Sequence, residues 1–438
     1  MAESALLLHP EMLQAALRLG TAKDLYYYGR ESLHKQAIPT VVDTRFKQAI
    51  NNLRQGSNTF IISVDQGVGD ILMGVKLPAH NPAGGVNYTD LGVERGWLYQ
   101  AIARASIRYA GSSQYFWTGS QMLIENMREM PNPDTRDRLL ELGGAAMLGN
   151  DTSGAGDFAG DNLYAYAYLN FPHNSPNGSL DKPNPFPSEM LMQPIVITVE
   201  LNDLRSIFSS AVASGSLAGA PTSFEEGWFQ VKQTHANDRG DLMVASADRS
   251  KAYSFPSKGF YQNEITVGLQ GQASYSVLLT GFRAGMVRDI IFWITDNSDT
   301  APATTDRFAR NYTKFVLPKD VVLTYNGTVY ADFQATSSEF WNVVSTETPA
   351  MIQASNVAVV STNLQLQAAP RKWTEINFGQ VYQQLSASHT YVAGKTIQNA
   401  VVNLSVGGLD PAKAYTLHAM YAYNCVLMIA DGTCTYAF

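Results

Sequence analysis

The sequence predicts an all-β protein made of two consecutive β-sandwiches with short helical insertions. Tyr and Phe are abundant, with 22 and 19 residues, and 34 Gly and 19 Pro residues are scattered among short apolar runs. This mixture favours strands and turns over long helices. The chain has 438 residues, which is enough for two cores because single domains usually contain ~100–200 residues.

The first predicted element is a short N-terminal helix. Pro10 suits its first position, and Gly20 suits the residue after its end. One face of this helix is apolar and consists of Met12, Leu13, Ala16 and Leu17. Two interpretations stay open: the helix packs on its own domain, or it is an arm that contacts a neighbouring molecule or a lipid surface.

The strands predicted in the first half follow a period of two residues. Tyr164, Tyr166 and Tyr168 alternate with smaller residues, and residues 195–201 alternate between apolar and less apolar side chains. The expected strands are residues 59–64, 71–77, 101–109, 164–169, 195–201 and 228–233. A polar, charged stretch then indicates a linker. The predicted organisation is a helical arm over residues 1–24, a first sandwich over 25–235, a linker over 236–256 and a second sandwich over 257–438.

Two hairpin turns are predicted in the second half. Asn326-Gly327 and Asp431-Gly432 lie between apolar runs and fit two-residue hairpins. The second turn would place Cys434 opposite Ile429, and Cys425 then lies roughly 13 Å further along the strand. That distance is too long for a disulfide, so both cysteines are expected as free thiols, as in a reducing compartment. The other expected strand segments are residues 265–269, 275–279, 287–294, 357–366, 400–406 and 414–429.

The few predicted helices expose an internal repeat. Ser120 would cap a helix over residues 121–130, and a second helix would run from Pro133 to Leu142 and end at Gly143. A capping box of Thr336 and Glu339 predicts another helix over residues 340–344.

Residues 106–111 and 322–327 both end in a turn that is followed by aromatic residues and then a helix. Their tyrosines, Tyr109 and Tyr325, are 216 positions apart, close to half of the 438 residues. This spacing predicts two copies of one β-sandwich.

Charge and apolar patterning exclude several functions. The net charge is −7, which makes direct, sequence-specific nucleic-acid binding a poor fit because such binding needs clustered Lys and Arg. Residues 1–60 carry seven basic and five acidic side chains, or +2, which leaves −9 for the rest. The sequence contains neither a secretory signal nor an apolar run of ~18 residues that could span a membrane.

No catalytic, cofactor-binding or metal-ligating residue is predicted. The seven histidines are never within five residues of one another, which gives no local support for a metal site. Gly67–Asp70 and the stretch from Gly154 to Gly160 fail the spacing of dinucleotide loops and are interpreted as ordinary loops. Asp151, Asp157 and Asp161 fit a solvated loop better than a calcium loop. We therefore expect no cofactor and no enzyme activity.

Three segments resemble a known family. They are a helical insertion over residues 117–144, a Pro-rich loop with its flanking strands over 167–201 and a closing hairpin over 417–438, about 85 residues in all. In these segments and in element order, the chain resembles the double jelly-roll major capsid proteins of large eukaryotic DNA viruses and of their Polinton-like and adintovirus-like relatives.

The resemblance implies two eight-stranded jelly rolls and a homotrimer that forms a pseudo-hexagonal capsomer of an icosahedral shell. The strands would stand along the shell normal, and the loops expected to face solvent are residues 143–162, 172–190, 202–226 and 295–312. The apolar face of the N-terminal helix would lie on the inner surface, against a minor protein, a neighbouring capsomer or an inner membrane. Further implied partners are neighbouring capsomers, penton proteins and minor capsid proteins. The implied location is the virion capsid, assembled inside the infected host cell.

Two alternatives remain. The first is a carbohydrate-binding or glycoside-cleaving β-sandwich, in which some of the six tryptophans stack on sugars and two convergent carboxylates cleave the glycosidic bond. The second is an adhesion or tail-fibre protein, for which secretion and repeats of ~100 residues would be expected.

Overall fold

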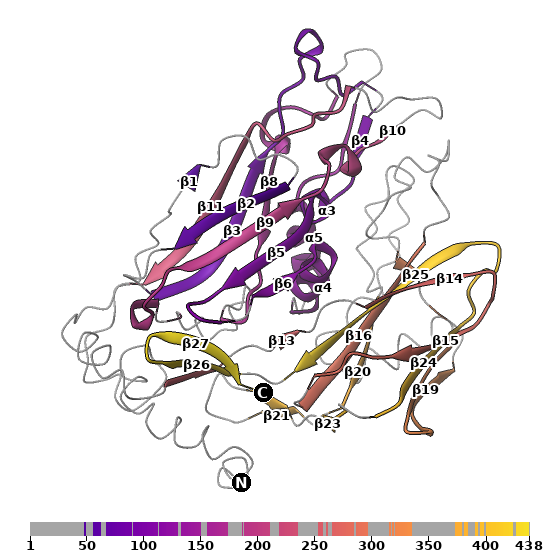
Figure 1. Ribbon diagram of the computed structural model, residues 1–438. Coiled ribbons are helices and arrows are strands. Elements are labelled where there is room, and N and C mark those ends of the chain that lie inside the picture. Colours follow the sequence, from indigo (N-terminus) through magenta and orange to yellow (C-terminus); the bar gives the residue numbers. More distant parts are fainter. Residues whose placement is uncertain are drawn as a thin grey trace.

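The described part of the chain is mostly β, and the α-helices in it lie in the first half (Figure 1). The computed structural model describes residues 48–49, 56–62, 67–89, 91–112, 114–129, 133–149, 156–173, 186, 188–210, 219–234, 253–256, 260–261, 265–283, 286–296, 315–316, 318, 320–334, 373–378, 381–383, 390–392, 395–397, 400–423 and 426–437. None of the helices in this described part is long and apolar enough to cross a membrane.

The first sandwich consists of two four-stranded antiparallel sheets. Sheet 1A has the order β1 (Gln48–Ala49), β11 (Glu226–Thr234), β3 (Gly67–Lys76) and β8 (Tyr164–Tyr168). Sheet 1B has the order β2 (Gly56–Ile62), β9 (Ile195–Leu201), β5 (Ile102–Arg108) and β6 (Tyr115–Trp117). Numbered along the chain, the eight strands are ordered 1-8-3-6 in sheet 1A and 2-7-4-5 in sheet 1B.

The second sandwich repeats this order. Sheet 2A contains β14 (Ile265–Gln270), β25 (Ala414–Tyr423), β16 (Met286–Asp296) and β20 (Trp373–Asn377). Sheet 2B contains β15 (Tyr275–Leu279), β24 (Val402–Gly407), β18 (Asp320–Tyr325) and β19 (Thr328–Gln334). Eight antiparallel strands in two such sheets form a jelly roll, so the predicted fold class of two consecutive jelly rolls is confirmed.

Several short strands and helices supplement the sandwiches. In the second half, β13 (Phe260–Tyr261), β17 (Phe315–Val316) and β23 (Lys395–Thr396) extend sheet 2A, while β21 (Val381–Gln383) pairs with β22 (Thr390–Val392). In the first half, β10 (Ser209–Ser210), β4 (Leu91–Val93) and β7 (Met147–Leu148) form a small sheet. Among the described residues, the α-helices are α3 (Trp97–Ala101), α4 (Gly119–Glu129) and α5 (Pro133–Leu142). The 3-10 turns in the same part lie at Pro82–Gly84, Gly160–Leu163, Ser188–Met190 and Leu204–Ile207.

The internal repeat found in the sequence corresponds to equivalent strands. Residues 106–111 cover the end of β5 and the turn after it, and residues 322–327 cover the end of β18 and its turn. Both β5 and β18 are the fourth strand of their sandwich. The helix predicted over residues 340–344 lies outside the described residues.

Both predicted hairpin turns are confirmed. Asn326 and Gly327 have φ of 48° and 80°, and Asp431 and Gly432 have φ of 51° and 71°. Positive φ at both central residues defines the type I′ turn that matches the twist of a hairpin. The second turn joins β26 (Val426–Ala430) to β27 (Thr433–Ala437), and Ile429 pairs with Cys434 as predicted. Cys434 is a buried free thiol, while Cys425 lies outside the described residues.

Two local predictions were wrong. Thr118, not Ser120, caps α4: its hydroxyl accepts from the backbone N–H of Gln121 at 3.3 Å, and Gln121 Oε1 accepts from the backbone N–H of Thr118 at 2.9 Å. This exchange is a capping box, which satisfies two donors that the first turn of a helix leaves free. Gly67–Asp70 is the start of β3, not a loop, because Gly67 and Val68 pair with β11.

The predicted linker contains a paired strand. Tyr253–Pro256 forms β12, which pairs antiparallel with β26. Strands β12, β26 and β27 therefore make a separate three-stranded sheet that joins the predicted linker to the end of the chain. The bounds of the four predicted segments, 1–24, 25–235, 236–256 and 257–438, stay a prediction.

Candidate functional site: the junction between the sandwiches

The histidines with described side chains serve packing. His173 Nε2 donates to the carbonyl of Gly69 at 3.2 Å, so its Nδ1 is left to accept from the hydroxyl of Tyr109. Burial lowers the pKa of His173 to about 4, so the ring is neutral near pH 7. His418 stacks on Trp293 with centroids 5.3 Å apart, and burial likewise lowers its pKa to about 4.

Asp157 of the Gly-rich loop accepts hydrogen bonds, and Asp161 lies in the 3-10 helix Gly160–Leu163. Asp157 Oδ2 accepts from the backbone N–H of Leu148 at 3.2 Å, and the Asp157 carbonyl accepts from Asn162 at 3.1 Å. Asp151 lies outside the described residues. Within the part of the chain that the structure describes, no group of three His, Cys, Asp or Glu side chains could hold a metal ion.

The tryptophans with described side chains are buried. Trp97, Trp117 and Trp293 are at most 2% exposed, and Trp228 is 5% exposed. An indole that stacks on a sugar needs an accessible face, and these four offer none.

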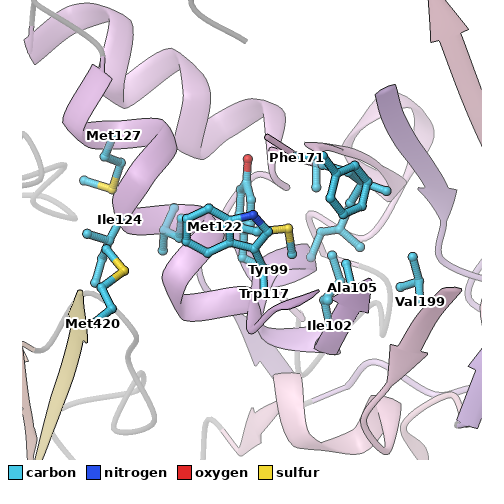
Figure 2. Packing of buried hydrophobic residues seen from close by; sticks show 14 of the residues in the cluster. Tyr99, Ile102, Ala105, Trp117, Met122, Ile124, Met127, Phe171, Val199 and Met420 are labelled. Atoms are coloured by element: carbon cyan, nitrogen blue, oxygen red, sulfur yellow. The ribbon is translucent and has the colours of Figure 1, made fainter. Parts of the chain in front are cut away.

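The most elaborate arrangement of side chains is the junction between the sandwiches. Figure 1 shows the two bodies next to each other, with α4 on the side of the first sandwich that faces the second. Figure 2 shows Ile124 and Met127 of α4 beside Met420 of β25, and all three belong to one buried apolar cluster.

Helix α4 covers the outer face of sheet 2A. Ile291 pairs directly with Met420, so their side chains share one face, whereas Ile290 and Tyr421 share the other. Tyr421 packs on Phe282, which follows β15, so its face is the inner one. Ile291 and Met420 are therefore on the outer face, yet both are fully buried. The outer face of sheet 2A is buried where it meets the first sandwich.

Helix α4 carries polar side chains into this buried region. Gln121, Glu125 and Asn126 are at most 1% exposed. The Asn126 amide donates to the hydroxyl of Tyr99 at 3.1 Å and to the carbonyl of Tyr168 at 3.2 Å. These bonds fix the orientation of α4 on the first sandwich, because a buried amide that lost them would carry an uncompensated desolvation cost.

The C-terminal hairpin β26–β27 makes a second junction. The carbonyl of Gly432 accepts from the N–H of Met192 at 2.8 Å, and the N–H of Cys434 donates to the carbonyl of Ala110. Both acceptor and donor partners belong to the first sandwich, although the hairpin is the last part of the chain. The pKa of the Cys434 thiol is raised to about 12 by burial, so the thiol stays protonated and unreactive.

Aromatic rings support the hairpin from the first sandwich. Tyr436 packs against Tyr109 and Tyr115, with both pairs of ring centroids 6.3 Å apart. Tyr109 also contacts Phe186 at 5.0 Å and is held by the bond to His173. Distant segments of the chain thus converge on one aromatic cluster, which no local sequence pattern indicates.

The site residues predicted from sequence are Met12, Leu13, Ala16 and Leu17, and they lie outside the described residues. Their assignment to an inner-surface or neighbour-contact helix stays a prediction.

The repeated strand order and the packed contact between the two sandwiches define a double jelly-roll protein. No protein-family model matches the chain, and no curated protein matches it in sequence. Solved structures do match. The chain is similar to PBCV-1 VP54, fitted into a reconstruction of the virophage Sputnik, with a TM-score of 0.57 and 11% identity over 92% of this chain and 99% of that chain.

Two further structures give the same result. The match to the PBCV-1 virus capsid has a TM-score of 0.55 and 11% identity over 92% of this chain and 99% of that one. The match to the Faustovirus major capsid protein has a TM-score of 0.55 and 10% identity over 90% and 92%. Likeness at this identity establishes the fold, and the fold expected from the resemblance is confirmed.

Proposed function

We propose that this chain is a structural major capsid protein and not an enzyme. Three copies would form a pseudo-hexagonal capsomer, and capsomers would tile an icosahedral virion shell. The observation that carries this proposal is the doubled jelly roll: two bodies with the same strand order are packed against each other in one chain. Three such chains in a ring present six similar bodies, which approximates sixfold symmetry with a threefold assembly.

The fold comparisons support this proposal, because the Faustovirus match is itself a major capsid protein. The proposed partners are two further copies in the trimer, neighbouring capsomers, and penton and minor capsid proteins. The helix with Met12, Leu13, Ala16 and Leu17 would face the interior, where it would contact a minor protein, a neighbouring capsomer or an inner membrane. The proposed location is the virion capsid, with assembly inside the infected host cell.

The carbohydrate-binding or glycoside-cleaving alternative gains no support from the described residues. Its expected stacking platform would need an exposed tryptophan, and the four described indoles are buried.

The test is light scattering on the purified protein after size-exclusion chromatography, followed by negative-stain imaging. We expect a species of about 144 kDa, three times 47.9 kDa, with a hexagonal outline or spontaneous shells. A stable monomer that binds immobilised glycans would contradict the proposal and favour the carbohydrate-binding alternative.

A further inference from the structure

The outer face of sheet 1A carries a row of aromatic side chains. Tyr164, Tyr166 and Tyr168 of β8 are half-buried, while Ala165 and Ala167 between them are fully buried. The alanines point into the core, so the tyrosines point outward. The row continues onto the neighbouring strands at outward positions, because Tyr166 pairs with Gly74, which pairs in turn with Trp228.

Trp228 gives this face a fixed shape. An added Cβ on Gly74 would lie 2.3 Å from Cε2 of Trp228, so the indole lies directly on the bare glycine backbone. Tyr164 and Tyr166 flank the ring, with centroids 6.2 and 5.7 Å away. Trp228 is 5% exposed and yet lies outside the buried apolar cluster of the sandwiches. The face is therefore an ordered aromatic platform and not a set of scattered side chains.

The equivalent face of the second sandwich shows what covers such a platform. Sheet 2A occupies the same position in the strand order as sheet 1A, and its outer side chains Ile291, Trp293 and Met420 are at most 1% exposed. Its cover is α4, which follows β6, the fifth strand of the neighbouring sandwich. Within one chain, the side of the first sandwich next to its fifth strand, β6, therefore packs on the outer face of sheet 2A in the second sandwich.

The described residues of the fifth strand in the second sandwich include exposed apolar side chains. This strand is β19, in which Val329 is 56% exposed and Tyr330 is 41% exposed. Val329 pairs with Thr324, and the Tyr330 ring packs on Phe378 with centroids 4.8 Å apart. An exposed valine beside a partly exposed aromatic pair on a sheet-edge strand is an apolar surface that a second copy can cover.

We propose that the outer face of sheet 1A, with Tyr164, Tyr166 and Trp228 at its centre, binds the β19 side of the second sandwich in another copy of this chain. In this contact, the β19 side packs on sheet 1A of another copy in the way that α4 packs on sheet 2A within one chain. It is head-to-tail, so each copy uses both surfaces, and repetition closes a ring. The inference rests on the trimer in the proposed function and specifies its interface.

The test uses one charged substitution on each surface and a matched control. Tyr166→Glu places a carboxylate on the platform, and Val329→Glu places one on β19. Ile61→Glu is the control, because Ile61 is 58% exposed on the outer face of the other sheet of the first sandwich. We expect the wild type and Ile61→Glu to remain near 144 kDa, whereas Tyr166→Glu and Val329→Glu fall to 47.9 kDa with an unchanged far-UV circular dichroism spectrum.

Mixing the two defective variants tests the head-to-tail arrangement. The Tyr166→Glu chain keeps an intact β19, and the Val329→Glu chain keeps an intact platform, so one contact can form and the ring cannot close. We expect a mixed dimer of about 96 kDa, twice 47.9 kDa, and no trimer.

A wild-type trimer with both Glu variants still at 144 kDa would overturn this interface and leave the proposed function intact. A wild-type monomer would count against both. Val329 is mostly exposed, so its variant remains informative even if Tyr166→Glu fails to fold.

Discussion

The two sandwiches have the same strand order but differ in what covers their A sheets. The central strand β16 buries side chains on both faces, and its sequence from Ile290 to Ile294 is continuously apolar. The equivalent third strand of sheet 1A, β3, buries Ile71, Met73 and Val75 on its inner face but leaves Leu72 and Lys76 half-buried on its outer face. A strand that is covered on both faces has a continuously apolar sequence. A strand that is covered on one face alternates between buried and more exposed side chains. The cover of a sheet, more than its topology, therefore determines the pattern in its sequence.

Each A sheet also places an indole on its outer face, by different means. In sheet 2A, Trp293 and His418 stack nearly parallel, at 3° between planes, beneath the neighbouring sandwich. In sheet 1A, Trp228 lies over Gly74, with tyrosines on either side. The first indole lies at the junction of the two sandwiches, and the second, which is 5% exposed, is enclosed between tyrosines on an outer face.

The largest expected effect comes from removing these indoles. Trp293→Ala should destabilise the protein by about 3–5 kcal/mol, because it leaves a cavity between the sandwiches. Trp228→Ala should cost less, because its site borders half-exposed tyrosines that can close over the gap. Denaturant titration followed by far-UV circular dichroism, at one fixed protein concentration, measures both. Equal losses would mean that the two faces are equally enclosed.

Acid should weaken both sandwiches through their buried histidines. His173 and His418 have a folded-state pKa of about 4 against an ordinary value of 6.5. Between these values the unfolded chain binds protons that the folded chain does not, so stability falls as the pH drops from 6.5 to 4.

The expected loss is about 3 kcal/mol for His173 by pH 4. Stability curves of His173→Gln and His418→Gln over this range check it, and each variant should be flatter than the wild type. A slope unchanged by either substitution would assign acid sensitivity to the carboxylates instead.

Two glycines on the outer A-sheet faces form a matched pair. Gly74→Ala would bring a methyl group 2.3 Å from the Trp228 ring and should cost about 1–3 kcal/mol. Gly268→Ala, on the exposed strand β14, meets nothing within 4 Å and should be neutral or stabilise by about 0.5–1 kcal/mol. Thermal unfolding distinguishes them, and the same sign for both would contradict the placement of Trp228.

The smallest expected effect lies on the outer faces of the B sheets. Arg104 and Glu200 form a cross-strand ion pair at 2.6 Å with side chains 42% and 37% exposed. A double-mutant cycle should give a coupling of about 0.2–1 kcal/mol that declines in salt, as expected for exposed pairs. Ser276 and Ser405 pair by hydroxyls on sheet 2B at 3.3 Å, and their coupling should not depend on salt.

The sequence predicted the features that are encoded locally. The Asn326-Gly327 and Asp431-Gly432 turns could be located because positive φ at both positions favours these residues. The alternation in β8 and β9 gave their faces directly. The repeat at Tyr109 and Tyr325 indicated the doubled sandwich, which the strand order confirms.

The junction could not be predicted, because its contacts join distant segments. The bond between Ala110 and Cys434 leaves no periodic pattern, and a helix such as α4 carries the same apolar stripe whether it covers one body or two. Gly67–Asp70 was mistaken for a loop because its pairing with β11, more than 160 positions later, is invisible locally. Long-range pairing thus accounts for the missed junction and for the error at Gly67–Asp70, whereas the error at Ser120 was local, because the cap lies two positions earlier at Thr118.

The contact between the C-terminal hairpin and the first sandwich can form only late in biosynthesis. Ala110 emerges from the ribosome 324 positions before Cys434, its hydrogen-bonding partner. At ~5–20 residues per second, the first sandwich is complete for many seconds before the segment that fastens the second body to it exists. During that interval the Ala110 carbonyl cannot yet accept its bond from Cys434. A chain truncated before β26 would lack the hairpin that makes this bond, so Tyr109 and Tyr115 of its first sandwich would lose their contact with Tyr436.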